Sequence, residues 1–154
     1  MNAQDTLFVP FNKSNFVTYQ LASLQNKLNA QASRILSKHS NLTLTEWRIL
    51  LMVSVWDMDS MAAITRESGM DKGQVSRAVK SMADKGYMRT VNDKTDARAL
   101  VLQVTEDGLR VKEDVLPRMS RRQERLMKSV TDEDRAAMER VINALEDASR
   151  IDDF

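Results

Sequence analysis

Residues 61–104 constrain the fold of this chain more than any other segment. Two stretches with helical periodicity are separated by Ser68-Gly69, and the second stretch ends at Gly86, a residue suited to a left-handed helix cap. Two short stretches rich in apolar and β-branched residues follow, with a polar segment between them. The predicted helices cover residues 61–67 and 71–85, and the predicted strands cover residues 87–92 and 99–104. Two short helices joined by a tight turn and followed by a β-hairpin form a winged helix-turn-helix.

Capping signals indicate where the helices begin. Thr43 and Glu46 have the Thr-x-x-Glu spacing of a capping box, in which the hydroxyl and the carboxylate each satisfy a free backbone N–H. Asp71 and Gln74 repeat this spacing in an Asp-x-x-Gln variant at the start of the second helix of the motif. Two further caps are predicted, for a long helix after the hairpin and for the last helix, at Thr105 and at Thr131 or Asp132.

Long helices with one apolar face are predicted at both ends of the chain. The residues on these faces are Val17, Leu21, Leu24, Leu28, Ala32 and Ile35 in the first helix and Met138, Val141, Ile142 and Leu145 in the last. The winged lobe is too small to cover both faces, so we expect an obligate homodimer. Because the chain has only 4 Gly and 2 Pro, we expect helices to dominate. Together with the predicted hairpin, this gives a fold class that is mainly α with a small β-hairpin wing. We expect a single domain, residues 1–154, in which dimerisation helices at residues 16–38 and 105–150 flank a winged lobe at residues 43–104.

Composition and missing motifs exclude several classes of protein. The chain has no cysteine and a single histidine, His39, which excludes a disulfide framework and a histidine-rich metal site. No apolar run is long enough to cross a membrane, and the N-terminus lacks the pattern of a secretory signal, so we expect a cytoplasmic protein. There is no Gly-x-Ser-x-Gly elbow, phosphate-binding glycine loop or zinc motif. We therefore expect neither an enzyme nor a cofactor.

The second helix of the motif has two different sides. Its apolar side holds Val75, Ala78, Val79 and Met82, and its opposite side holds Gly73, Ser76, Arg77, Lys80 and Asp84. Short residues let the helix backbone approach a DNA major groove, lysine reaches phosphates, and arginine can grip guanine with two donors. An ordinary solvated helix face has a similar composition. The position of this helix, after a tight turn and before a hairpin, favours binding to double-stranded DNA.

The polar tip of the hairpin has a charge pattern of its own. Lys94 and Arg98 flank Asp96, whose carboxylate can hold the arginine guanidinium in a fixed orientation. An arginine oriented in this way could enter the narrow minor groove of DNA, where the negative potential is concentrated. The alternative interpretation is a charged surface turn.

Four motifs resemble those of the multiple-antibiotic-resistance regulator (MarR) family of winged-helix transcription factors. They are Leu42-Thr43-x-x-Glu46-Trp47-x-x-Leu50, Gln74-Val75-Ser76-Arg77-x-Val79, Asp84-Lys85-Gly86-Tyr87-Met88-Arg89 and the Asp93-x-x-Asp96-x-Arg98 wing. The resemblance implies a homodimer that binds pseudo-palindromic DNA, and it extends over nearly the whole chain. The DNA-binding residues predicted from the helix face, the wing and the resemblance together are Lys72, Gln74, Ser76, Arg77, Lys80, Lys94, Asp96 and Arg98. Thr95 stands where the wing of the family usually carries Arg.

A repressor whose DNA affinity changes when a small molecule binds is the function we expect. The predicted ligand pocket lies at the junction between the first helix and the winged lobe, near Tyr19, Trp47 and Met52. Without cysteine and with one histidine, the effector is expected to be an aromatic or anionic organic molecule, and neither a metal nor a peroxide. The alternative is a helical oligomeric adaptor that binds protein without responding to a ligand, which the hairpin and the polar helix face disfavour.

Overall fold

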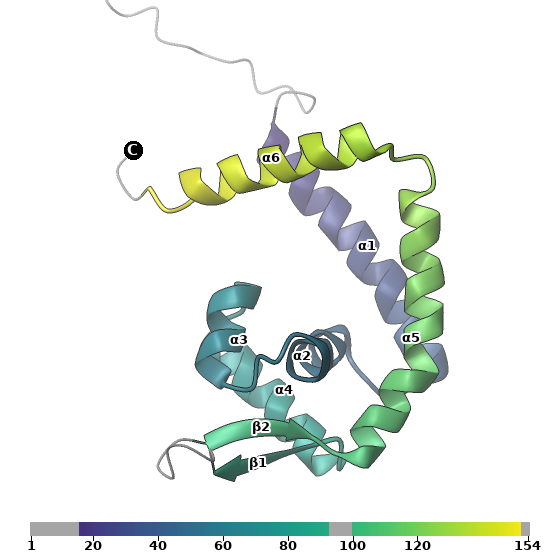
Figure 1. Cartoon of the computed structure of the whole chain (residues 1–154), viewed down its shortest axis with the longest axis vertical. Helices are drawn as coiled ribbons and strands as arrows, with labels where there is room; N and C mark the ends of the chain where they lie inside the picture. Colours follow the sequence, from purple (N-terminus) through teal and green to yellow (C-terminus); the bar gives the residue numbers. More distant parts are fainter. Residues whose placement is uncertain (1–15, 93–99, 152–154) are drawn as a thin grey trace, which may run out of the picture. The chain divides into compact units, whose positions relative to one another are not determined.

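The computed structural model of the chain describes residues 16–92 and 100–151. These ranges contain, in order, α1 (Val17–His39), α2 (Leu44–Val55), α3 (Met61–Ser68), α4 (Lys72–Asp84), β1 (Met88–Asn92), β2 (Leu100–Val104), α5 (Glu106–Met127) and α6 (Asp132–Ala148) (Figure 1). The predicted fold class, mainly α with a β-hairpin wing, is confirmed. Among the described helices, none combines the length and the hydrophobicity needed to cross a membrane.

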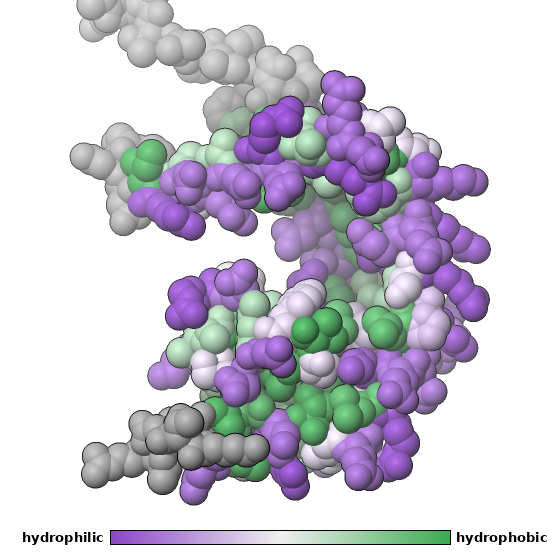
Figure 2. All heavy atoms as spheres, in the orientation of Figure 1, coloured by the Kyte–Doolittle hydropathy of each residue, from purple (hydrophilic) through white to green (hydrophobic). Residues whose placement is uncertain are grey.

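The chain divides into two compact units, Met1–Pro117 and Arg118–Phe154. The first unit contains the helix-turn-helix, the hairpin, α1 and the first half of α5. The second unit contains the rest of α5 and all of α6, and none of its described residues is buried. Apolar side chains instead reach the surface along α6 (Figure 2), and they include Met138, Val141, Ile142 and Leu145.

The core of the first unit is built around α2. Its residues Ile49 and Leu50 are fully buried, as expected for a helix that is apolar nearly all round. The core also takes side chains from the neighbouring elements, namely Leu36 of α1, Ile64 of α3, Val75 and Met82 of α4, Met88 of β1 and Leu102 of β2. The second helix of the motif therefore packs through its apolar side, which positions its opposite side.

The predicted helix ends are confirmed by hydrogen bonds. Thr43 and Glu46 form the full capping box: Thr43 Oγ1 accepts from the Glu46 N–H at 3.2 Å, and Glu46 Oε2 accepts from the Thr43 N–H at 2.7 Å. Asp71 Oδ1 accepts from the Gln74 N–H at 2.8 Å and caps α4. Gly69 has φ 65° in the turn between α3 and α4, a left-handed conformation that glycine adopts without strain.

The hairpin is antiparallel, with a register from Met88 opposite Val104 to Asn92 opposite Leu100. The backbone N–H of Leu102 also donates to the carbonyl of Asp59 at 2.6 Å, which ties β2 to the segment before α3. The hairpin is thereby tied to the segment that leads into the helix-turn-helix.

Candidate nucleic-acid interface

The structure places the two sides of α4 as the sequence predicts. Val75, Ala78, Val79 and Met82 are buried, whereas Lys72, Ser76, Arg77 and Lys80 are exposed. Gln74 is half-buried near the start of the helix. The exposed set consists of a hydroxyl and three cations on one helix, which is the chemistry that contacts phosphates and base edges in a major groove.

Gly73 gives the side chain of Arg77 room to lie along the helix. A Cβ at Gly73 would come within 3.1 Å of Arg77 Nη1 and within 3.1 Å of Asp71 Oδ1. The guanidinium therefore lies over the first turn of α4, close to the carboxylate that caps the helix.

The predicted wing residues Lys94, Asp96 and Arg98 lie outside the described residues. The strands that carry the wing end at Asn92 and resume at Leu100, both of which are exposed.

A buried ion pair fixes the C-terminal end of α4. Glu46 is only 1% exposed, and Lys85 Nζ lies 2.8 Å from both of its carboxylate oxygens. Burial by itself raises the pKa of Glu46, but hydrogen bonds from Lys85, Ser81 and the Thr43 N–H together with the charge of Lys85 hold that pKa below its ordinary value. Glu46 is therefore ionised at neutral pH. The capping box revealed this glutamate in the sequence, but no spacing signal linked it to a lysine 39 positions away.

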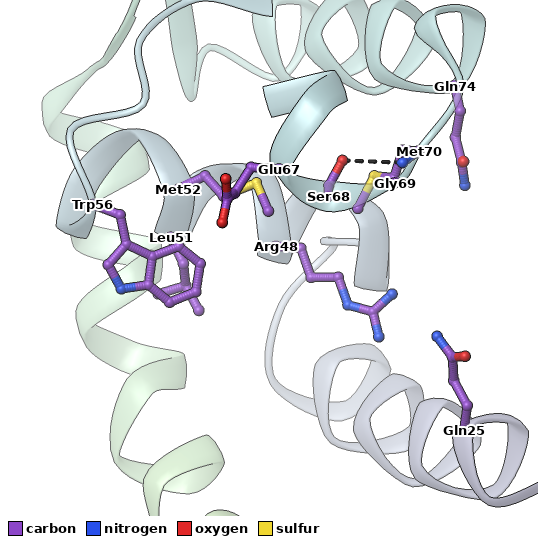
Figure 3. Close-up of a pocket in the computed structure, with 10 residues that line it drawn as sticks. All are labelled: Gln25, Arg48, Leu51, Met52, Trp56, Glu67, Ser68, Gly69, Met70 and Gln74. Carbon is purple, nitrogen blue, oxygen red and sulfur yellow. Dashed lines mark hydrogen bonds between the residues drawn. The ribbon is translucent and has the colours of Figure 1, made fainter. Parts of the chain in front are cut away.

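An open cavity of about 510 Å³ lies in the first unit, between α1, α2 and the turn that joins α3 to α4 (Figure 3). Its lining residues are Gln25, Arg48, Leu51, Met52, Trp56, Glu67, Ser68, Gly69, Met70 and Gln74. Arg48 Nη2 donates to Asn29 Oδ1 of α1 at 2.7 Å. The cavity thus combines an aromatic ring and apolar side chains with the guanidinium of Arg48 and the carboxylate of Glu67, and it borders both the turn of the motif and the start of α4.

Of the three predicted pocket residues, only Met52 lines this cavity. Trp47 is 3% exposed and belongs to the core, and Tyr19 is exposed on the first turn of α1. The tryptophan at the cavity is Trp56, at the end of α2. Because α2 is apolar nearly all round, its sequence pattern does not tell whether Trp47 or Trp56, which follows the last residue of the helix, faces the core.

Within residues 16–92 and 100–151, no group of three or more His, Cys, Asp or Glu side chains is placed to hold a metal ion. The described residues instead present a helix-turn-helix, an antiparallel hairpin and a second helix with an exposed cationic side. These features define the class of winged-helix DNA-binding proteins.

Comparisons with known proteins agree with this class. The sequence model of the MarR family matches residues 40–99. The HTH-type transcriptional regulator SarZ of Staphylococcus haemolyticus (strain JCSC1435) is 24% identical over 99 residues, which are 64% of this chain and 67% of SarZ. A MarR/EmrR family transcriptional regulator from Acinetobacter sp. ADP1 is 26% identical, with a TM-score of 0.81 over 90% of this chain and 97% of that one. The MepR protein of S. aureus in its DNA complex is 13% identical but shares the fold, with a TM-score of 0.79 over 90% of this chain and 100% of MepR.

Over residues 40–99 the chain is thus similar to the MarR family, and SarZ and the Acinetobacter protein are both transcriptional regulators.

Proposed function

We propose that the chain binds pseudo-palindromic operator DNA as a homodimer and represses transcription until a small organic ligand binds. Its DNA target would place it in the cytoplasm. The observation that carries the proposal is the division of α4 into a buried apolar side and an exposed side with Ser76, Arg77 and Lys80. In a winged helix, this exposed side is the one that can enter a major groove. MepR, which has this fold, is known in complex with DNA.

The homodimer is supported by apolar side chains that the single chain leaves exposed. Leu21 and Leu24 are 46% and 52% exposed on α1, and Val141 of α6 is 55% exposed. Uncovered apolar residues at helical spacing on α1 and α6 favour a symmetric interface in which a second copy buries them. Sedimentation at micromolar concentration should show a dimer. A folded monomer would contradict this part of the proposal.

Substitutions on α4 test the DNA-binding role. Arg77→Ala should lose about 1–3 kcal/mol of affinity and relax the base preference, because one bidentate contact carries that much discrimination. Lys80→Ala should weaken binding to all sequences alike and reduce the salt dependence, since a phosphate contact carries no sequence information. If both variants bound selected and scrambled duplexes like the wild type, α4 would not be the reading helix.

The cavity beside α4 supports regulation by a ligand. Arg48 can pair with a carboxylate, and Trp56 and Met52 offer apolar contact to a ring, so the cavity suits an aromatic acid. A ligand there would contact the α3–α4 turn and would regulate only if it bound the DNA-incompetent conformation more tightly. Titration with aromatic carboxylates should change the fluorescence of Trp56 and release DNA, whereas Trp56→Phe should lose most of the fluorescence change. If saturating aromatic carboxylates altered neither fluorescence nor DNA affinity, this cavity would not be an effector site for that class.

A further inference from the structure

Lys85 uses its charge inside the protein. Its ammonium nitrogen lies 2.8 Å from both carboxylate oxygens of Glu46 and 2.8 Å from the backbone carbonyl of Asn41. A lysine ammonium has three donors, and these acceptors account for all of them. Only 25% of the Lys85 side chain is exposed. Although it follows the cationic recognition helix directly, Lys85 is not available to DNA as Lys80 is.

The acceptors of Lys85 belong to the junction between α1 and α2. Asn41 follows the end of α1 by two residues, and Glu46 lies in the first turn of α2. A second bond joins the same places, because Tyr87 Oη donates to Asn41 Oδ1 at 2.9 Å. The C-terminal end of α4 is therefore attached at two points to the segment that connects α1 with the winged lobe.

The N-terminal end of α4 is held differently. There the side-chain bond is the local cap, in which Asp71 accepts from the N–H of Gln74 within the first turn of the same helix. In addition to the core packing of Val75 and Met82, long-range polar contacts at the Lys85 end therefore tie α4 to the junction between α1 and α2. A tilt of this helix would displace Arg77 from a base edge without removing any group that touches DNA.

We propose that Lys85 is a positioning residue for DNA recognition, which locks the recognition helix to the α1–α2 junction through Glu46 and Asn41. The inference rests on the proposed DNA-binding function and assigns Lys85 a role other than phosphate contact.

The test uses the full-length chain and duplexes that the wild type selects from a random-sequence pool. The variants are Lys85→Met, Glu46→Gln, their double mutant, and Lys80→Met as the matched control on the exposed side of the same helix. Glu46→Gln keeps an oxygen for the Thr43 cap, since glutamine also completes a capping box. Affinities for selected and random duplexes are measured over a range of salt, at a temperature where circular dichroism shows each variant to be folded.

Lys85→Met should lower affinity for the selected duplex by roughly 5- to 150-fold, the loss expected when one bidentate contact is misaligned. Its affinity for random duplex and its salt slope should stay at the wild-type values. Lys80→Met should instead reduce the slope by about 0.9 for each phosphate that the lysine neutralises, on both kinds of DNA. Glu46→Gln should share the Lys85→Met phenotype, and the double mutant should lose no more affinity than either single mutant.

Three results would overturn the proposal. A reduced salt slope in Lys85→Met, as in Lys80→Met, would make Lys85 a phosphate contact. Unchanged affinity of folded Lys85→Met and Glu46→Gln for selected DNA would leave the pair a purely structural role. If Lys85→Met does not fold, the salt slope and the selected-duplex affinity of Glu46→Gln are used in its place. A wild-type chain that enriches no duplex would contradict the proposed function itself, and the positioning role with it.

Discussion

Gly108, in the first turn of α5, should not tolerate even a methyl group. A Cβ there would overlap the carbonyl oxygen of Tyr87 and lie 2.7 Å from Cγ1 of Val104. The same carbonyl accepts the N–H of Thr105 at 3.1 Å, and Thr105 Oγ1 donates to the carbonyl of Gly86 at 2.6 Å. The absence of a side chain thus lets α5 start against the backbone that follows the recognition helix.

The magnitude for Gly108→Ala follows from these contacts. Overpacking against backbone costs about 1–3 kcal/mol. Shifting the Tyr87 carbonyl weakens its hydrogen bond from Thr105, which costs about 1 kcal/mol more. The higher helix propensity of alanine offsets about 1 kcal/mol. We therefore expect the variant to be destabilised by about 1–3 kcal/mol.

Urea unfolding at fixed protein concentration measures this loss, because the midpoint falls while the slope stays constant. Gly73→Ala is the matched control within another helix: its Cβ would meet two side-chain atoms at 3.1 Å, Arg77 Nη1 and the capping Asp71 Oδ1, and no backbone atom is among them. It should cost less than Gly108→Ala, because the higher helix propensity of alanine, about 1 kcal/mol, offsets the displacement of these side chains. Equal midpoints for Gly108→Ala and the wild type would refute the close approach of α5 to the Tyr87 backbone.

Three further predictions concern single sites. Asp57 has φ 53°, a left-handed conformation that glycine adopts with less strain. Asp57→Gly should therefore raise the free energy of unfolding by about 0.5–1 kcal/mol, and a lower urea midpoint would contradict this. The pKa of Glu46 is lowered from its ordinary value of 4.5, so its carboxylate stabilises the fold above that pH, and this stabilisation is lost as the pH falls through the pKa of the folded state. The wild type should therefore be more stable than Glu46→Gln at pH 7 and should lose that advantage in acid. A constant gap from pH 7 to pH 3 would argue against this. Arg98→Ala and Asp96→Ala should weaken DNA binding non-additively if the carboxylate only orients the arginine, and a double-mutant cycle with additive losses would remove that pairing.

Local signals in the sequence were enough to predict the helices, the hairpin and the sides of α4. The Thr43–Glu46 box and the Asp71 cap are contacts between residues three positions apart, so the spacing of residue types reveals them. Burial of Val75 and exposure of Arg77 likewise follow from helical periodicity.

Contacts between distant residues gave no such signal. The pairing of Lys85 with Glu46 and the bond from the Leu102 N–H to the Asp59 carbonyl join segments through the tertiary fold, and no periodicity reports them. The cavity was harder still, because it depends on which side of an almost wholly apolar helix faces the core. In the structure Trp47 lies in the core and Trp56 lies at the cavity, and the sequence pattern does not distinguish these two positions.

The central claim is that two copies of α4 read DNA together. Sequencing the duplexes that the wild-type chain enriches from a random pool tests it most directly. We expect a pseudo-palindromic motif whose half-site centres lie about one helical turn apart, roughly 10–10.5 base pairs, because two recognition helices enter successive major grooves on one side of the duplex. Arg77→Ala should lose the enrichment of at least one base pair in each half-site. Enrichment of no sequence, or of one unrepeated half-site by the wild type, would contradict the account.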